Sequence, residues 1–191
     1  MIDFQVEGRI AVIRLDRVEA RNAINGEMAQ AIESAIDRFE DDDELWVAIL
    51  GHYGPVFCAG ADLKEIAAVD GPAVAGGTEI ALACDLCVAA KGSSFGIPKV
   101  KRSLVAAAGG LVRLPRVLPP AIAMELALTG DTIDAQRAYE LGMINDLCEP
   151  GTVIECAMSL AERINANAPL AVRSSRQLIL DAPGQSDAEG M

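Results

Sequence analysis

The chain has 191 residues, of which 51% are hydrophobic and only 4% aromatic, so it is long enough for one domain with a core of Ala, Val, Ile and Leu. Its formal net charge of −12 argues against nucleic acid or an anionic membrane as a partner. No apolar run approaches the length of a membrane span and the first residues lack a signal-peptide pattern, so we expect a cytoplasmic protein.

The first part of the chain alternates between strand and helix patterns. An apolar run at 9–15 is typical of a strand, and Asn25 can cap a helix over 26–40 whose apolar residues recur at helical spacing. A second strand follows at 46–50. The order predicts two parallel strands joined by a right-handed crossover. The acidic run between them, at 41–44, is interpreted as solvated surface.

The central feature of the sequence is the segment 71–85, which places Gly76 and Gly77 at the start of an apolar helix that reaches about residue 84. Residues without a Cβ let a ligand approach the unpaired backbone N–H groups of a helix start, where developing negative charge on an oxygen is stabilised. Glu79 falls in the first turn, and its apolar neighbours would desolvate it, which suits acid/base work. Alternatively, Glu79 only offsets the helix dipole, although the capping box it would need is incomplete at Gly76.

The second part of the chain becomes increasingly helical. A strand at 86–90 precedes a turn at 94–98, and the basic run 99–102 is either a solvated loop or a phosphate contact. Segments 56–64 and 106–110 are rich in small residues, so both can let a ligand touch the backbone. We expect a helix to begin at 63–68, others at 121–128, 134–141, 152–165 and 169–180, and an extended piece at 143–148. Residues 1–118 would form the core, and 119–191 a helical part of the same domain.

Cysteine and histidine usage gives little support for metal or redox chemistry. The five cysteines are an odd number in mostly apolar settings, which favours reduced, buried thiols. Cys84 and Cys87 have the spacing of a redox or zinc motif, but no second pair accompanies them. His52 is the only histidine and we interpret it as a loop residue. A Gly-x-Ser-x-Gly elbow is absent from the sequence, so a serine triad using His52 is disfavoured.

Five ordered blocks resemble the crotonase family, that is, the enoyl-CoA hydratases and isomerases. They cover nearly the whole chain and lie at residues 15–23, 57–64, 71–85, 95–98 and 128–131. The resemblance implies an α/β fold, a crotonase-like spiral of short strands and helices with a helical C-terminal part. It also implies a homotrimer or a dimer of trimers.

The resemblance implies an acyl-CoA thioester substrate and no cofactor beyond its coenzyme A. Matched motif to motif, the backbone N–H groups of Ala61 and Gly76 would hold the thioester oxygen and stabilise an enolate, while Glu79 moves a proton. The residues that would border the CoA part are Arg21, Ala23, Asp62, Leu63 and Lys64, with surface solubility as the alternative role of Arg21 and Lys64.

Lys99 departs from the family pattern. The resemblance places a second glutamate of the hydratases after Pro98, where this chain has Lys99, and a lysine cannot do a carboxylate's work as a base unless it is strongly desolvated. One-acid proton transfer through Glu79 is therefore favoured over two-acid hydration, with Lys99 as a ligand contact. The alternatives are a catalytically silent acyl-CoA-binding or assembly protein and, more distantly, a dehydrogenase, whose Gly-x-Gly-x-x-Gly spacing the central glycines do not give.

The resemblance also implies that residues are absent. The family places a helix and most of a strand between the blocks at 57–64 and 71–85, and further helices after residue 191. Two neighbouring parallel strands need a crossover of about a dozen residues or more, so we expect an absent segment near 65–70. We favour the omission of some segments from the sequence over a truly shortened protein, because a deleted crossover would leave the sheet hard to connect.

Overall fold

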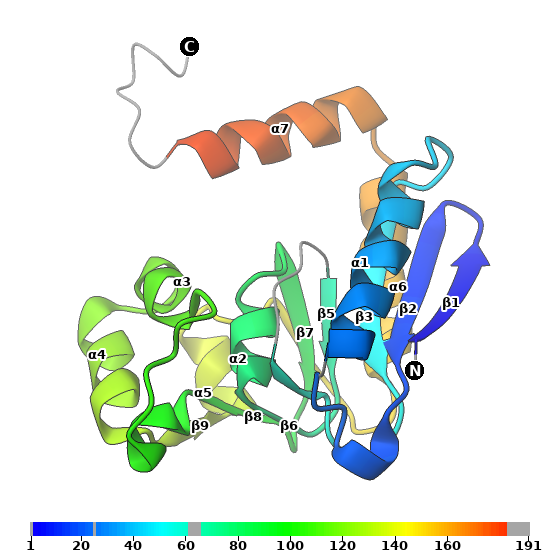
Figure 1. The fold of residues 1–191 in the computed structure, drawn as a ribbon. Coiled ribbons are helices and arrows are strands. Elements are labelled where there is room, and N and C mark those ends of the chain that lie inside the picture. Colours follow the sequence, from blue (N-terminus) through cyan, green and yellow to red (C-terminus); the bar gives the residue numbers. More distant parts are fainter. Residues whose placement is uncertain (1, 25, 61–65, 183–191) are drawn as a thin grey trace.

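The computed structural model describes residues 2–24, 26–60 and 66–182. Within them, the larger sheet has the strand order β1-β2-β3-β5-β7-β10 (Figure 1). The strands are β1 (Ile2–Glu7), β2 (Ile10–Leu15), β3 (Val47–His52), β5 (Ile66–Val69), β7 (Leu86–Ala90) and β10 (Asp146–Cys148). β1 pairs antiparallel with β2, and every other neighbouring pair is parallel. The parallel pairing predicted for the first two strands of the sequence is confirmed by β2 and β3.

A smaller sheet has the order β4-β6-β8-β9. Its strands are β4 (Cys58–Gly60), β6 (Pro72–Ala75), β8 (Ser94–Gly96) and β9 (Thr132–Asp134). β4, β6 and β8 are parallel, and β9 runs antiparallel to β8. The chain therefore alternates between sheets as it passes from β3 to β8, which is the spiral that the sequence predicts.

The helix expected at 63–68 is wrong over 66–68. Those residues lie in β5, where Ile66 pairs with Ile49 on one side and with Leu86 on the other. β4 and β6 are indeed parallel neighbours, but the chain between them crosses over through β5 in the other sheet. In the described part of the chain, this connection consists of a strand of the larger sheet rather than a helix.

The two faces of the larger sheet are covered by different layers. Ile10 and Val12 of β2 belong to a cluster completed by α6 (Val153–Asn165), whereas Ala11 and Ile13 face a larger cluster that includes α1 (Gly26–Glu40). This alternation is the two-residue period of a strand that is buried on both faces. Figure 1 shows α1 and α6 beside the larger sheet, with α2 next to the smaller one.

The remaining helices follow the sequence prediction in part. They are α2 (Gly76–Ala81), α3 (Gly110–Val117), α4 (Pro120–Thr129), α5 (Ala135–Glu140) and α7 (Pro169–Asp181), with two short 3-10 helices, η1 (Val18–Ala20) and η2 (Pro98–Arg102). The cap predicted at Asp134 is confirmed, since its Oδ1 accepts the Arg137 N–H at 2.7 Å. Among the described helices, none is both long and apolar enough to cross a membrane.

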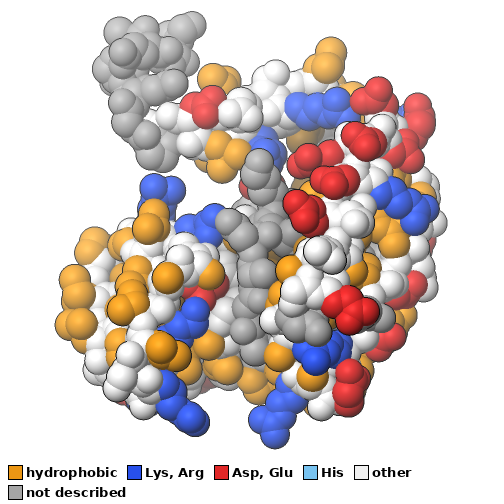
Figure 2. Space-filling model, in the orientation of Figure 1, with side chains coloured by type: hydrophobic (Ala, Val, Ile, Leu, Met, Phe, Trp, Pro, Cys, Tyr) orange, Lys and Arg blue, Asp and Glu red, His pale blue; other side chains and the backbone are white. Residues whose placement is uncertain are grey.

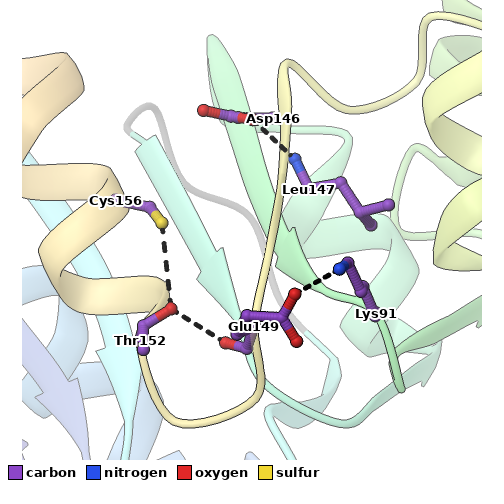
Figure 3. A network of polar contacts seen from close by, with 6 residues as sticks. All are labelled: Lys91, Asp146, Leu147, Glu149, Thr152 and Cys156. Carbon is purple, nitrogen blue, oxygen red and sulfur yellow. Dashed lines mark hydrogen bonds and ion pairs between the residues drawn. The ribbon is translucent and has the colours of Figure 1, made fainter.

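A polar network fixes the turn from β10 to α6 (Figure 3). Lys91 forms an ion pair with Glu149, and the Thr152 hydroxyl donates to the Glu149 carbonyl at 2.9 Å. Thr152 also lies 4.0 Å from the Cys156 sulfur. This turn holds the first residues of α6 against the end of the larger sheet.

Burial sets the properties of several cysteines and of His52. Three of the five cysteines, Cys58, Cys87 and Cys148, are buried. Burial raises the pKa of the Cys87 thiol to about 12, so it stays protonated and unreactive at neutral pH. His52 is not a loop residue but the last residue of β3, and its Nε2 accepts the Asp70 N–H at 3.2 Å. Burial lowers the pKa of His52, which keeps the imidazole neutral.

Candidate active site

The site is built on a strained turn between β6 and α2. Ala75, which precedes the helix, has φ 55° and ψ −115°, a backbone conformation that costs a non-glycine residue free energy and occurs preferentially at functional sites. Gly76 is the first residue of α2 and is buried. The N–H of a first helical residue has no intrahelical acceptor, so this turn provides a donor for a ligand oxygen.

Two contacts hold the first turn of α2 in place. The Thr78 hydroxyl lies 2.6 Å from the Ala73 carbonyl and accepts the Gly96 N–H at 2.8 Å, which joins α2 to β6 and β8. A Cβ on Gly77 would lie 1.9 Å from the Cys58 carbonyl oxygen of β4, so only glycine fits there. The sequence pattern favours ligand approach at Gly77, whereas in the structure this residue lets two backbone segments approach each other closely.

Glu79 is fully buried, with 0% of its surface exposed. Its Oε2 lies 2.6 Å from the Nζ of Lys99, and its Oε1 accepts the Gly110 N–H at 3.2 Å. Lys99 lies in η2, and 26% of its side chain is exposed. A buried carboxylate needs a paired charge and hydrogen bonds, and these two contacts supply them. The geometry thus combines two predicted site residues in one ion pair.

Gly110 is a partner of Glu79 that sequence analysis missed. It begins α3, and a Cβ at this position would lie 2.8 Å from the Glu79 Cγ. The sequence signalled only that 106–110 permits close backbone approach. The structure shows that the approaching group is the Glu79 side chain itself.

A cavity of about 360 Å³ opens next to the ion pair. Lys99 and Ile97 line it on the side of the site, and Leu111 and Leu114 of α3 line it on another. The side chains around it are almost entirely apolar. Its volume lies in the range of small-molecule pockets in proteins.

The turn at Arg21 is connected to the site by Asn22, which sequence analysis did not select. Asn22 is 1% exposed, and its amide donates to the carbonyls of Tyr53 and Val56 at 2.9 and 2.7 Å. Arg21 is exposed, with a left-handed backbone, and Ala23 is half-buried. Asn22 therefore fixes this turn against the loop that enters β4, while the Arg21 side chain remains accessible from solvent.

Four of the predicted site residues lie outside the described residues: Ala61, Asp62, Leu63 and Lys64. Of the predicted pair of backbone donors, the structure therefore places only Gly76. The segment before them ends in β4, which pairs with β6 through Cys58 and Ala73.

Comparison with known proteins adds the family to this geometry. A sequence profile described as enoyl-CoA hydratase/isomerase matches residues 5–67 and 65–182. The chain belongs to the enoyl-CoA hydratase/isomerase family. It is similar to the (E)-benzylidenesuccinyl-CoA hydratase of Thauera aromatica, with 34% identity over 206 residues, 92% of this chain and 80% of that protein.

Solved structures of the enoyl-CoA hydratase/isomerase family share the fold. An enoyl-CoA hydratase from Mycobacterium tuberculosis H37Rv has 45% identity and a TM-score of 0.95, with 99% of this chain and 85% of that chain covered. A carnitinyl-CoA hydratase from Mycobacterium avium has 39% identity and a TM-score of 0.90, with 97% and 82% covered. The α/β fold of crotonase type predicted from the sequence is confirmed.

The enoyl-CoA hydratase/isomerase profile matches in two stretches that meet at 65–67. The alignment with the Thauera aromatica protein runs over 206 positions but contains only 92% of this 191-residue chain. That relative therefore has residues without a counterpart in this chain. The break in the profile match coincides with the place where the sequence predicts an absent segment.

Proposed function

We propose that the protein acts on an acyl-CoA thioester by one-acid proton transfer through Glu79. The observation that carries this proposal is the ion pair at the site. In the described part of the chain, the charged side chain that contacts Glu79 is the Lys99 ammonium rather than a second carboxylate. Membership of the enoyl-CoA hydratase/isomerase family supports the thioester substrate.

The proposed reaction moves a double bond from the 3,4 to the 2,3 position of an enoyl-CoA. The thioester oxygen accepts hydrogen bonds from the N–H of Gly76 and, as the resemblance implies, of Ala61. Those donors stabilise the enolate that forms when the α-proton leaves. Glu79 takes the proton from the α carbon and returns it to the γ carbon, so its charge is restored. Hydration would also need a second group to activate or protonate water, and Lys99 is poorly suited to replace a carboxylate there.

The proposal needs no cofactor other than the coenzyme A of the substrate. We propose that the Arg21 to Ala23 turn, together with Asp62, Leu63 and Lys64, borders the CoA part. Arg21 is exposed, so its guanidinium is available to phosphate oxygens. Local cations of this kind are necessary because the net charge of −12 repels an anionic ligand.

We further propose that the protein assembles as a homotrimer or hexamer. α7 has no buried residue, and its apolar side chains Leu170 and Ile179 are 76% and 72% exposed. Figure 1 shows α7 projecting away from the sheets, where the Arg176–Asp85 ion pair at 2.7 Å ties it to the remainder of the protein. Exposed apolar surface of this extent is typical of interaction sites.

Lys99 also favours one rival, a catalytically silent acyl-CoA-binding or assembly protein. The Lys99 Nζ lies 2.6 Å from the Glu79 Oε2. If this ion pair persisted with substrate bound, the carboxylate would remain unreactive.

One paired assay separates the enzyme from the silent protein. NMR would follow 3-butenoyl-CoA and crotonyl-CoA in separate samples of the same preparation, beside a binding measurement on both. We expect conversion of 3-butenoyl-CoA to crotonyl-CoA with little hydration of the latter. Binding of both thioesters without conversion of either would support the silent protein, and rapid hydration would show that Lys99 is compatible with two-acid chemistry.

A further inference from the structure

Two thiols outside the candidate active site lie together beneath α6. Cys148 is the last residue of β10 and is 3% exposed, and Cys156 lies near the start of α6. Both pack in the hydrophobic cluster between the larger sheet and α6, where α6 is in direct contact with β10. Figure 3 shows the Cys156 sulfur directed toward Thr152, in the turn that joins these two elements.

The two thiols are neighbours that act on each other. Burial raises the pKa of the Cys148 thiol, and a hydrogen bond with the Cys156 thiol raises it further. A hydrogen bond between thiols brings their sulfur atoms close together. The structure therefore places the pair within a small movement of the geometry that a disulfide needs.

The pair combines an accessible thiol with a buried one. Cys156 is half-buried, so a small oxidant can reach it from solvent, whereas Cys148 is buried. The raised pKa of Cys148 keeps its thiol protonated at neutral pH, and a protonated thiol reacts poorly with oxidants. Oxidation therefore begins at Cys156. Cys148 is already in contact with the product, and such proximity greatly accelerates a second step within the same molecule.

We propose that Cys148 and Cys156 are a modification site that forms a reversible disulfide on exposure to a hydroperoxide. The Cys156 thiolate attacks one oxygen of hydrogen peroxide, the O–O bond breaks, and the hydroxide that leaves takes up a proton to become water. Cys156 is then a sulfenic acid. The Cys148 sulfur attacks the Cys156 sulfur, the S–O bond breaks, and the hydroxyl leaves as water with the Cys148 proton. The two thiols lose two electrons in total, which the peroxide gains.

The thiol pair is separate from the candidate active site. The Glu79 neighbour Ile80 and Leu114 of α3 belong to the cluster on the other face of the larger sheet. Figure 2 shows hydrophobic side chains gathered over α3 and α4, beside the active site. Cys84 and Cys87, whose spacing in the sequence is typical of a redox motif, also pack in that other cluster. The proposal therefore does not depend on acyl-CoA chemistry.

Peptide mapping of the oxidised wild-type protein tests the proposal. Reduced protein would be treated with hydrogen peroxide, blocked with N-ethylmaleimide in urea and digested with a protease that cuts after glutamate. Cleavage after Glu155 places Cys148 and Cys156 in different peptides, so their disulfide appears as a linked pair in mass spectrometry. We expect this pair, the loss of two of the five thiols, their return with dithiothreitol, and a rate independent of protein concentration.

Three single variants assign the roles of the two thiols. Cys156→Ser should form no disulfide. Cys148→Ala should leave the Cys156 sulfenic acid unresolved, so that dimedone labels it, whereas the wild-type protein should take up little dimedone. Cys84→Ser is the matched control, because Cys84 is also half-buried but lies outside the pair. It should form the disulfide as the wild-type protein does.

The wild-type map decides the proposal even if a variant folds poorly. A linked peptide pair of Cys148 and Cys156 that persists in Cys84→Ser supports it. Retention of all five thiols, a disulfide between Cys84 and Cys87, or conversion of Cys156 to a sulfinic acid without a linked pair would overturn it. A disulfide that joins two chains, visible on a non-reducing gel, would also overturn it.

Discussion

Glu79→Gln should lower the rate of 3-butenoyl-CoA isomerisation by roughly 100- to 10,000-fold, the range that positioned proton transfer contributes in enzymes. Glutamine has nearly the same shape, and its carbonyl can still accept the Gly110 N–H, which in the wild-type protein bonds Oε1 at 3.2 Å. It cannot carry a proton between two carbons. The measurement is kcat by NMR, with Kd for a saturated acyl-CoA determined on the same variant.

The control for this variant is Glu125→Gln, an exposed glutamate of α4 that should keep the wild-type rate. The variant must bind the saturated thioester and unfold cooperatively for the comparison to report on chemistry. General acid–base catalysis contributes at least about 100-fold to a rate. A Glu79→Gln variant whose isomerisation rate stays within about threefold of wild type would therefore show that Glu79 does not move the proton.

Lys99→Met should destabilise the protein by about 3 kcal/mol, because removal of the ammonium leaves a buried carboxylate without a paired charge. The Glu79 carboxylate is 0% exposed and loses its 2.6 Å contact with the ammonium. For a chain of this length the change corresponds to a fall in Tm of roughly 6 to 12 °C. The double variant with Glu79→Gln should recover most of the loss, since it removes both charges.

Lys91→Met is the matched control for the second prediction. Lys91 also pairs with a glutamate, Glu149, but the side chains are 56% and 66% exposed (Figure 3). Exposed ion pairs contribute at most about 1 kcal/mol. The measurement is the free energy of unfolding in urea for the wild type, Lys99→Met, the double variant and Lys91→Met. Equal losses in Lys99→Met and Lys91→Met, or a double variant no more stable than Lys99→Met, would contradict a buried ion pair at the site.

Elements with strong local signals were predictable from the sequence. α1 occupies the predicted residues 26–40, β7 the predicted 86–90, and α5 begins after its predicted Asp134 cap. In each case hydrophobic periodicity, a cap or a flanking turn acts within a few residues.

Elements that depend on distant partners were missed. The local sequence predicts a turn where β8 lies, whereas its three residues gain their extended structure from pairing with β6 and β9. The local sequence predicts the start of a helix where β5 lies, whereas its residues form a strand by pairing with β3 and β7 on either side. α3 contains Pro115, begins at Gly110 and is preceded by Gly109, so its local pattern argues against a helix although α4 packs beside it.

The site could be predicted residue by residue but not as an arrangement. Glu79 and Lys99 were identified from motif positions, whereas their 2.6 Å contact and the Gly110 N–H at the other carboxylate oxygen required the fold. Asn22 gave no sequence signal because its two carbonyl acceptors lie more than thirty residues away. The cavity is formed by η2, α3 and α4 together, so the sequence of any one segment does not predict it.

Label transfer within one substrate molecule tests one-acid chemistry most directly. The experiment is isomerisation of 3-butenoyl-CoA carrying two deuterium atoms on its α carbon, in H₂O, with mass spectrometry and NMR of the crotonyl-CoA formed. Because Glu79 is fully buried, we expect it to return part of the deuterium to the γ carbon before exchange with solvent. Product with only hydrogen added at the γ carbon, accompanied by rapid hydration, would contradict a single shuttling carboxylate.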